Sequence, residues 1–289
     1  MTGNSVIDDF AAVQTRDTGR GADATRRNSA RIPASQLRSS LAQVATAAPS
    51  AAAARQNAQL PAFAPLLEEL EVAGWSSHRR MLSGNFHDWA IIEGRTLLVL
   101  AGQAVAAHGN CTIDPIEAAL VAQGVWASVR SHAQHAGDAG TLLSLAAQSL
   151  WSVTNTGLQA SVAVALIDLN GGHASVAVAG DCLALRIRAT SSEQVATCQP
   201  ALSGDTDFMY LSHSIPLAVR ERIVLIADEP VHRPAKLVSK IAGSFSRLDA
   251  EAHRRMMAAD AISLVRESFE QSTQDTERTT ASIVAVRRR

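Results

Sequence analysis

Histidines and cysteines are the first candidates for chemistry, because they supply most metal ligands and many nucleophiles in proteins. His132 and His135 lie three positions apart in a helix-like stretch and could reach one metal ion. No cysteine or further histidine lies beside them, so an exposed helix face is the favoured interpretation. Cys111, Cys182 and Cys198 are scattered without C-x-x-C spacing, which favours ordinary thiols in a reducing compartment.

The local patterns of several enzyme classes are missing. No catalytic Ser/His/Asp order, glycine-rich phosphate loop or metal motif can be recognised. The four tryptophans are interpreted as packing residues rather than a ligand cage. The sequence therefore contains no motif that would support the hypothesis of an unrelated α+β enzyme.

Length and charge set further bounds. The chain has 289 residues, of which 47% are hydrophobic, enough for one sizeable domain with a tail. A formal net charge of −1 offers no basic field for nucleic acid or an anionic membrane. No apolar run reaches the roughly 18–20 residues of a membrane helix, and Asp8 and Asp9 occupy the place of a signal peptide's basic segment. We expect a cytoplasmic protein.

The amino-terminal part differs in composition from the rest. Residues 1–60 are rich in Ala, Arg, Ser, Gln and Thr and have almost no aromatic side chain after Phe10. Such a segment has little apolar surface to offset the entropy lost on ordering. We predict a disordered or partly helical tail over residues 1–60, a linker over 61–70 and one domain over 71–289.

The first half of this domain shows a hairpin followed by two helices. Residues 86–92 and 95–100 are apolar runs that flank a turn at Glu93-Gly94. Residues 115–136 and 141–153 then have helical spacing, the first with Pro115 at its start. The face predicted to be buried on the first helix consists of Ile116, Leu120, Val125, Trp126 and Val129.

Strands dominate the second half. Residues 160–167 are apolar on both faces, and residues 173–188 follow a turn at 170–172 as the return strand, with Arg186 and Arg188 on a face that meets water. A strand at 222–227, a long helical region at 234–270 and a last strand at 282–286 complete the order. This order favours antiparallel sheets with helices packed outside.

Several local segments are informative when taken together. They are, in chain order, 83–89 (SGNFHDW), 93–97 (EGRTL), 102–108 (GQAVAAH) leading into 116–120 (IEAAL), 178–181 (VAGD), 215–219 (IPLAV), 224–229 (VLIADE) and 279–282 (TTAS). In this order they resemble the SpoIIE/RsbU-like branch of metal-dependent (PPM-type) serine/threonine protein phosphatases. The resemblance implies an α+β fold, a four-layer sandwich of two antiparallel β-sheets flanked by α-helices. In the resembled family, acidic residues at strand ends bind two divalent ions that activate water against a phosphoserine or phosphothreonine.

Most of these acidic positions are replaced here. They correspond to Asn85, Gln103, Asp228 and Thr279, the last with a register uncertain by one residue, so that only Asp228 remains as an anionic metal ligand. Amides and hydroxyls do not supply the charge that offsets repulsion between two cations. We expect no bound metal, and convergence of these four vestigial positions at one end of the sandwich.

Other residues near the same segments could rebuild an altered site. Asp88, Asp181, Glu229 and His87 could join Asp228 around one ion, although carboxylates at strand ends are more often solvated or capping groups. Ala106 and Glu229 also stand where the resembled family has glycine, which reduces the backbone freedom of both turns.

Two functions follow from the resemblance. The first is a pseudophosphatase that acts in bacterial-type signalling by binding a protein partner, such as a phosphorylatable regulator. The second is an active Mn²⁺- or Mg²⁺-dependent phosphatase with an atypical site. The identity of the partner and the oligomeric state do not follow from the sequence.

Overall fold

The computed structural model describes residues 60–76 except 62, 83–106, 114–150, 158–170, 172–189, 191–203, 208–228, 234–270 and 281–289, together with 54, 56 and 58. The tail predicted over residues 1–60 thus lies almost entirely outside the described residues. β1 begins at Leu70, one residue before the start predicted for the domain.

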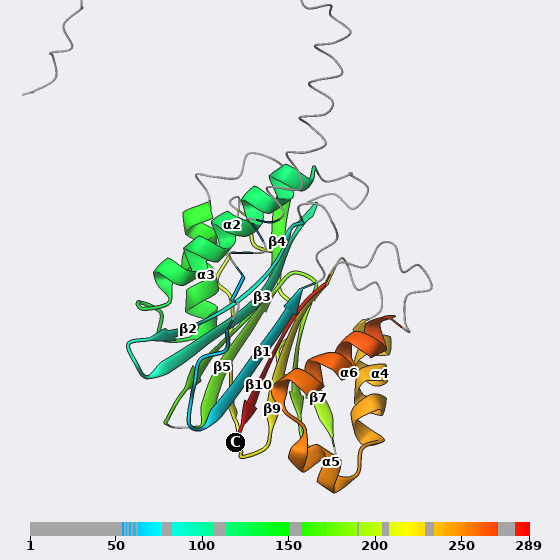
Figure 1. Ribbon diagram of the computed structural model, residues 1–289. Helices are drawn as coiled ribbons and strands as arrows, with labels where there is room; N and C mark the ends of the chain where they lie inside the picture. The colour runs from blue at the N-terminus through cyan, green and yellow to red at the C-terminus, as the bar shows by residue number, and fades with distance from the viewer. Residues whose placement is uncertain are drawn as a thin grey trace, which may run out of the picture. The chain divides into compact units, whose positions relative to one another are not determined.

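Within the described residues, ten strands form two five-stranded sheets in which every neighbouring pair is antiparallel (Figure 1). Sheet I has the order β2 (Asn85–Ile92), β3 (Thr96–Ala106), β4 (Leu158–Asp168), β5 (His173–Ala179) and β8 (His213–Pro216). Sheet II has the order β1 (Leu70–Ser76), β10 (Ala281–Arg288), β9 (Arg222–Asp228), β6 (Cys182–Ile187) and β7 (Ser192–Gln194).

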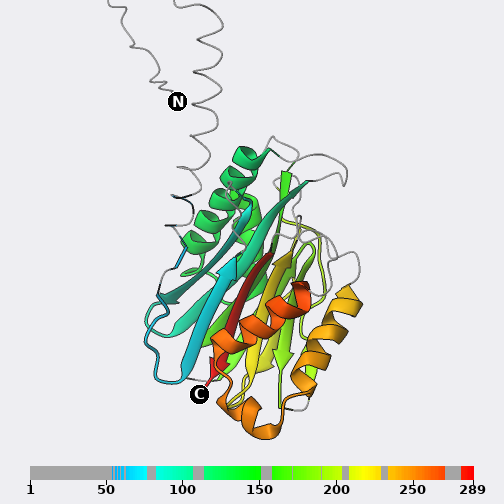
Figure 2. The same ribbon diagram turned by 45° about the vertical axis from the view of Figure 1, so that its right-hand side comes forward.

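Helices cover the outer faces of both sheets. α2 (Pro115–His132) and α3 (Ala139–Leu150) pack on sheet I, and α4 (Pro234–Ser246), α5 (Ala250–Arg255) and α6 (Ala258–Glu270) lie along sheet II (Figures 1 and 2). A third core of aliphatic side chains fills the space between the sheets. The predicted four-layer sandwich is confirmed. Within the described residues, no helix has both the length and the apolar character needed to cross a membrane.

Local sequence explains several of these elements. Glu93 and Gly94 both have positive φ, 48° and 68°, as in the type I′ turns that match the twist of a hairpin. Asp114 caps α2 by accepting a hydrogen bond from the Ile116 N–H at 2.8 Å, and Pro115 occupies the first helical turn. Hairpin and helix starts therefore lie where the sequence predicts them.

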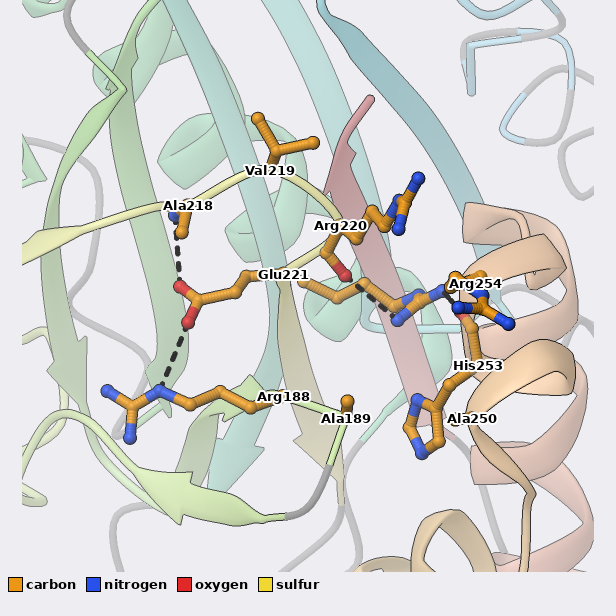
Figure 3. Close-up of a pocket in the computed structure, with 10 residues that line it drawn as sticks. Arg188, Ala189, Ala218, Val219, Arg220, Glu221, Ala250, His253 and Arg254 are labelled. Carbon is orange, nitrogen blue, oxygen red and sulfur yellow. Dashed lines mark hydrogen bonds and ion pairs between the residues drawn. The ribbon is translucent and has the colours of Figure 1, made fainter.

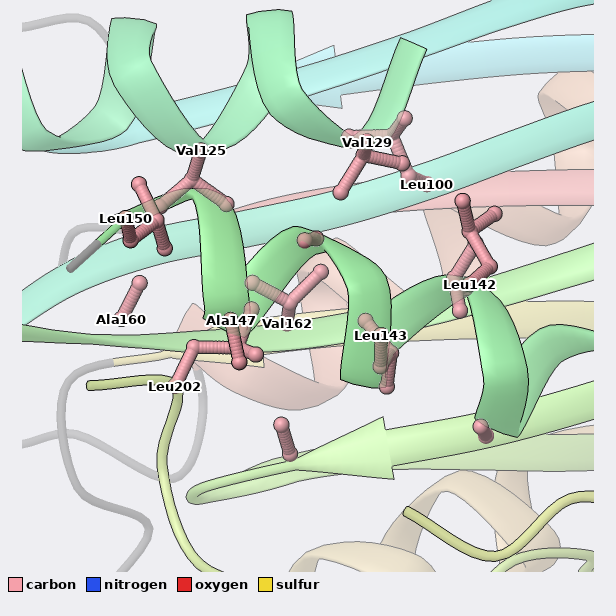
Figure 4. Packing of buried hydrophobic residues seen from close by; sticks show 14 of the residues in the cluster. Leu100, Val125, Val129, Leu142, Leu143, Ala147, Leu150, Ala160, Val162 and Leu202 are labelled. Carbon is pink, nitrogen blue, oxygen red and sulfur yellow. The ribbon is translucent and has the colours of Figure 1, made fainter. Parts of the chain in front are cut away.

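The core under α2 and α3 is built from small and branched side chains. Figure 4 shows Val125 and Val129 of α2 and Leu142 of α3 packed with Leu100 and Val162 of the sheet, all fully buried. Burial of each large side chain contributes about 1.5–3 kcal/mol. The predicted face was wrong in part, because Ile116 and Leu120 are 56% and 60% exposed, whereas Ala118, Val121 and Ala122 are buried with Val125 and Val129.

The single return strand predicted over 173–188 is wrong, because it is two strands in different sheets. β5 pairs with β4 in sheet I, whereas β6 pairs with β9 in sheet II. Gly180, at φ 68°, makes the corner, and a Cβ there would lie 2.3 Å from Ser161 Oγ. Apolar residues continue on both sides of Gly180-Asp181, so apolar character alone does not reveal the change of sheet.

Two other expectations also need correction. Arg186 does not meet water, since it is 7% exposed and its Nη2 lies 2.6 Å from Glu221 Oε2. The long helical region at 234–270 is three helices, with α5 beginning after Asp249, whose side chain accepts a hydrogen bond from the Ala252 N–H. The ion pair with Glu221 explains the burial of Arg186, and the Asp249 cap explains why a new helix begins within the predicted helical region.

Candidate functional site

A row of polar side chains crosses three strands of sheet I. Asn85 of β2 lies opposite Gln103 of β3, and Gln103 lies opposite Ser161 of β4. Residues directly opposite on antiparallel strands share one face of the sheet. All three are buried, with exposed fractions of 0%, 5% and 1%. The two amide positions that the sequence predicts to converge are therefore cross-strand neighbours.

This row faces the other sheet rather than the helices. Ala101 and Ala163, two residues from Gln103 and Ser161 on the same strands, belong to the core between the sheets. Side chains two residues apart on a strand point to the same face. The amides thus occupy one end of the interior of the sandwich.

Sheet II contributes hydroxyl groups to the same end. Ser76 of β1 and Ser282 of β10 lie opposite each other, with their Oγ atoms 2.8 Å apart. His87, two residues after Asn85 on β2, places Nδ1 2.6 Å from Ser76 Oγ and so links the two sheets. We call the group formed by Ser76, Asn85, His87, Gln103, Ser161 and Ser282 the amide end.

Asn85 is the least satisfied member of the amide end. Neither Oδ1 nor Nδ2 has a hydrogen-bond partner among the described residues, although the side chain is fully buried. A buried polar group without a partner costs about 1–3 kcal/mol. A contribution to stability from the described residues therefore does not explain why an Asn side chain is buried at position 85.

The other two vestigial positions are described only in part. Asp228 is the last residue of β9, and its backbone lies opposite Ala281, next to Ser282 of the amide end. Only the backbone of Asp228 is described, and Thr279 and Glu229 lie outside the described residues. Convergence of all four positions stays a prediction.

Asp88 points away from the amide end. It is three residues from Asn85 on β2 and so faces α2, where its Oδ2 accepts a hydrogen bond from Trp126 Nε1 at 2.7 Å and lies 3.1 Å from Arg130 Nε. The Arg130 guanidinium also stacks over the Trp126 ring. Burial raises the pKa of Asp88 even though Arg130 and the Trp126 bond oppose it. The structure does not bring Asp88 to a site shared with Asn85.

Asp181 lies closer to the amide end. It follows Gly180 at the corner between the sheets, and its backbone N–H donates to Ser161 Oγ at 3.1 Å. The residue is exposed. Its carboxylate is thus solvated, beside the buried row rather than within it.

The amide end does not fit two divalent ions. Among the described residues, no group of three His, Cys, Asp or Glu side chains could hold a metal ion. Two doubly charged ions 4 Å apart repel by about 16 kcal/mol at an effective dielectric constant of 20, four times the value for unit charges. Asn85 and Gln103 can offer carbonyl oxygens but no negative charge to offset that repulsion.

Sequence reasoning did not assign Ser76 or Ser161 to the site. Ser161 is the only polar residue in the apolar run 160–167, and this interruption is a signal that could have marked it. Ser76 has no comparable signal, because its role depends on pairing with a strand 206 positions away.

The two sheets, their outer helices and the polar strand ends define the PPM-type phosphatase fold. The chain itself belongs to the SpoIIE family, since the family model for stage II sporulation protein E matches residues 114–289, more than half of the chain. The resemblance stated from the sequence is confirmed. Asn85 and Gln103 precede the matched residues.

Solved structures agree on the fold. The SiaA-PP2C domain of Pseudomonas aeruginosa is 16% identical with a TM-score of 0.61, over 89% of this chain and 99% of that one. The RsbU and RsbW domains of a Mycobacterium tuberculosis protein give 17% identity and a TM-score of 0.56, over 78% of this chain and 61% of that chain. RsbX in complex with magnesium gives 11% identity and a TM-score of 0.54, over 78% of this chain and 98% of that one. A search of the curated proteins finds no significant match.

Proposed function

We propose that this chain is a pseudophosphatase, a SpoIIE-family domain that binds a protein partner without hydrolysing phosphoserine or phosphothreonine. The observation that carries the proposal is the cross-strand pair of Asn85 and Gln103, two neutral, buried amides at positions where the family uses carboxylates.

The charge of the site supports this proposal. An activated water needs a cation strong enough to lower its pKa towards neutrality, and the cations need anionic oxygens to stay bound. Asp228 is the only carboxylate at the four corresponding positions. One carboxylate leaves most of the charge of two divalent ions unbalanced.

The partner is a protein, and the best candidate class is a phosphorylatable regulator. A related structure contains RsbU and RsbW domains of one Mycobacterium protein, which places a similar fold beside a second signalling domain. A domain that keeps the fold but lacks the ions could still recognise such a regulator by its surface. We place this interaction in the cytoplasm.

Restoring the missing charge tests the proposal. The triple variant Asn85→Asp/Gln103→Asp/Thr279→Asp should bind Mn²⁺, measured by isothermal titration calorimetry, whereas the wild type should show no binding at millimolar Mn²⁺. Asn85→Asp alone should do little, because one added anion does not balance two cations. Mn²⁺ should also raise the melting temperature of the triple variant, since an ion that binds only the folded state stabilises it.

A control variant with the same added charge tests whether Mn²⁺ binding depends on the amide end or on net charge alone. Gln123 of α2, Gln134 in the turn after α2 and Gln148 of α3 are exposed, and their joint replacement by Glu adds three negative charges elsewhere. This control should not bind Mn²⁺ measurably. Micromolar binding of two Mn²⁺ ions by the unmodified protein would overturn the proposal.

The alternative is an active phosphatase with an atypical site. One observation favours it: the Oδ1 atom of Asn85 is buried and without a partner among the described residues, which leaves a carbonyl oxygen free to coordinate a cation. Asp181 and Asp228 would then supply the charge, with Mn²⁺ or Mg²⁺ as the ion. Manganese-dependent hydrolysis of a phosphopeptide, lost in Asp228→Asn, would establish this function instead.

A further inference from the structure

A second polar region lies at the other end of β9. A pocket of about 380 Å³ is lined by the β6–β7 and β8–β9 loops, by Arg222 at the start of β9 and by α5 (Figure 3). At the far end of β9, Ala227 lies opposite Ser282 of the amide end. Arg222 and Ala227 are five positions apart on an extended strand, which corresponds to a distance of about 17 Å. The pocket is therefore distinct from the amide end.

Positive charge dominates the pocket lining. The charged lining residues are Arg188, Arg220, Arg222, Arg254 and Glu221. Glu221 is already engaged, because its carboxylate accepts hydrogen bonds from the Ala218 N–H and the Arg188 Nε, as Figure 3 shows, and also from Arg186. We call this group of residues the arginine end.

Arg222 brings a buried cation to the pocket wall. The residue is 1% exposed, and its guanidinium donates to the carbonyl oxygens of Arg220, His253 and Met256. Its Nε has no partner among the described residues. Burial, together with the positive charge of Arg287, lowers the pKa of Arg222 to about 10, although Glu71 and Asp260 oppose this. Three backbone carbonyl groups accept hydrogen bonds from the guanidinium, and no carboxylate among the described residues forms an ion pair with it.

Arg220 is fixed at the mouth of the pocket by its backbone. Its φ is +70°, a left-handed conformation that is uncommon outside glycine. The backbone N–H donates to the Arg288 carbonyl at 2.7 Å and the carbonyl accepts from Arg222, so both peptide groups of the turn are committed. The side chain is exposed and forms no ion pair with the described residues.

His253 adds a second buried nitrogen without a partner. The Nε2 atom lies 3.0 Å from the Phe245 carbonyl, which can only accept, so Nε2 carries the hydrogen. Nδ1 has no partner among the described residues, and the residue is 2% exposed. Arg222 thus brings an N–H donor without a partner among the described residues to the pocket wall. Nδ1 of the neutral His253 ring can only accept a hydrogen bond, so His253 lines the pocket without donating to an anion.

We propose that the arginine end binds the phosphate group of a small phosphorylated molecule. Guanidinium groups present paired N–H donors that match phosphate oxygens, and an anion in the pocket would offset the unbalanced charge of Arg220 and Arg222. The volume lies in the range of small-molecule sites. The remaining lining residues are Ala189, Ala218, Val219, Ala250 and His253. The lining contains no Phe, Tyr or Trp ring, and the His253 ring is only 2% exposed, so little aromatic surface is offered to a nucleobase and the ligand is compact and non-aromatic.

Calorimetric titration of the full chain with pyrophosphate, inorganic phosphate and glycerol phosphate, at constant ionic strength, tests the proposal. We expect a Kd of about 1 mM or tighter for at least one of them, because a few charge-assisted hydrogen bonds supply the corresponding binding free energy. Arg220→Gln/Arg254→Gln should weaken binding at least about tenfold. Unchanged melting temperature of this variant would show that the loss is not unfolding.

Arg255→Gln is the matched control. Arg254 and Arg255 both pair with Glu251 on α5, but only Arg254 lines the pocket. The control should keep the wild-type affinity within about twofold, because an exposed ion pair contributes little. Equal weakening by Arg255→Gln, or no binding by the wild type, would overturn the proposal. Tighter binding of a phosphoserine peptide than of glycerol phosphate, dependent on Arg220, would overturn the assignment to a small molecule.

Discussion

The amide end and the arginine end differ in the kind of polar side chain that each of them buries. Asn85 and Gln103 are neutral and buried, whereas Arg186 and Arg222 are charged and buried, Arg222 in the pocket lining and Arg186 against Glu221 of that lining. The same aliphatic core lies between the sheets and joins both ends. The fold therefore does not need carboxylates at the amide end, which is why a binding site can change its chemistry while its scaffold persists.

The largest expected effect is at the corner beside the amide end. Gly180→Ala should lower the free energy of unfolding by about 4 kcal/mol, because a positive φ costs about 1–2 kcal/mol and the added methyl group overpacks the site. That Cβ would lie 2.3 Å from Ser161 Oγ and 3.0 Å from Ser161 Cα. Urea unfolding measures the difference.

Gly94→Ala isolates the backbone part of this cost. Gly94 has the same φ of 68°, but a Cβ there meets nothing within 4 Å. Its loss should be only about 1–2 kcal/mol. Equal losses at Gly180 and Gly94 would show that the contact with Ser161 is not a constraint.

The second-largest effect is expected when the negative charge of Glu221 is removed from the arginine end. Glu221→Gln should destabilise the protein by about 3 kcal/mol, since it removes the nearer anion of the buried Arg186 and leaves only the more exposed Glu193, at 3.6 Å. The exposed fractions of the Glu221 and Arg186 side chains are 14% and 8%. Glu251→Gln, which breaks exposed pairs on α5, should change stability little in the same denaturation experiment. Similar losses for both variants would remove the distinction between buried and exposed pairs.

A smaller effect, of opposite sign, is expected at the amide end. Asn85→Leu should stabilise the protein by about 1–2 kcal/mol, because it removes an amide whose donor and acceptor have no partner among the described residues. Ser161→Ala is the contrasting change, since it removes the acceptor of the Asp181 N–H and should destabilise. Destabilisation by Asn85→Leu in thermal unfolding would mean that the amide is held by a ligand or by residues outside the described part.

The smallest expected effect is a difference in pH dependence. Burial tends to raise the pKa of Glu221, but the Ala218 N–H and Arg186 outweigh it and hold the pKa below 4.5. Its stabilising contribution is present above pH 4.5 and is lost as pH falls through the folded pKa. For Asp88, burial raises the folded pKa above 3.8, so its contribution is complete below pH 3.8 and is lost as pH rises through the folded pKa.

Urea unfolding between about pH 3 and 7 can separate the two carboxyl groups. The deficit of Glu221→Gln relative to wild type should shrink on acidification. Asp88→Asn should gain relative to wild type as pH rises above 3.8. Parallel pH profiles for the wild type and both variants would contradict the two assigned pKa directions.

Local pattern was enough to predict most of the fold but not its non-local contacts. The Glu93-Gly94 turn and the start of α2 at Pro115 follow from neighbouring residues. The burial of Arg186 depends on Glu221, 35 positions away, and no periodicity carries that information. At the site, Asn85 and Gln103 are assigned from the sequence through the resembled segments, and they lie opposite each other on β2 and β3, but their role at a metal site stays a prediction. The contacts of Ser76 and His87 required the two sheets to be assembled first.

The pairing of β1 with β10 has a consequence for synthesis of the chain. Ser76 and Ser282 lie side by side although 206 positions separate them. Strands β2 to β5 pair in sequence order, with α2 and α3 between β3 and β4, and can pair as they leave the ribosome. Among the described strands, β1 has no partner until β10 has been made. Its apolar inward residues, Leu70 and Val72, would stay exposed for that interval. We expect this strand to be the segment of a nascent chain that a chaperone binds.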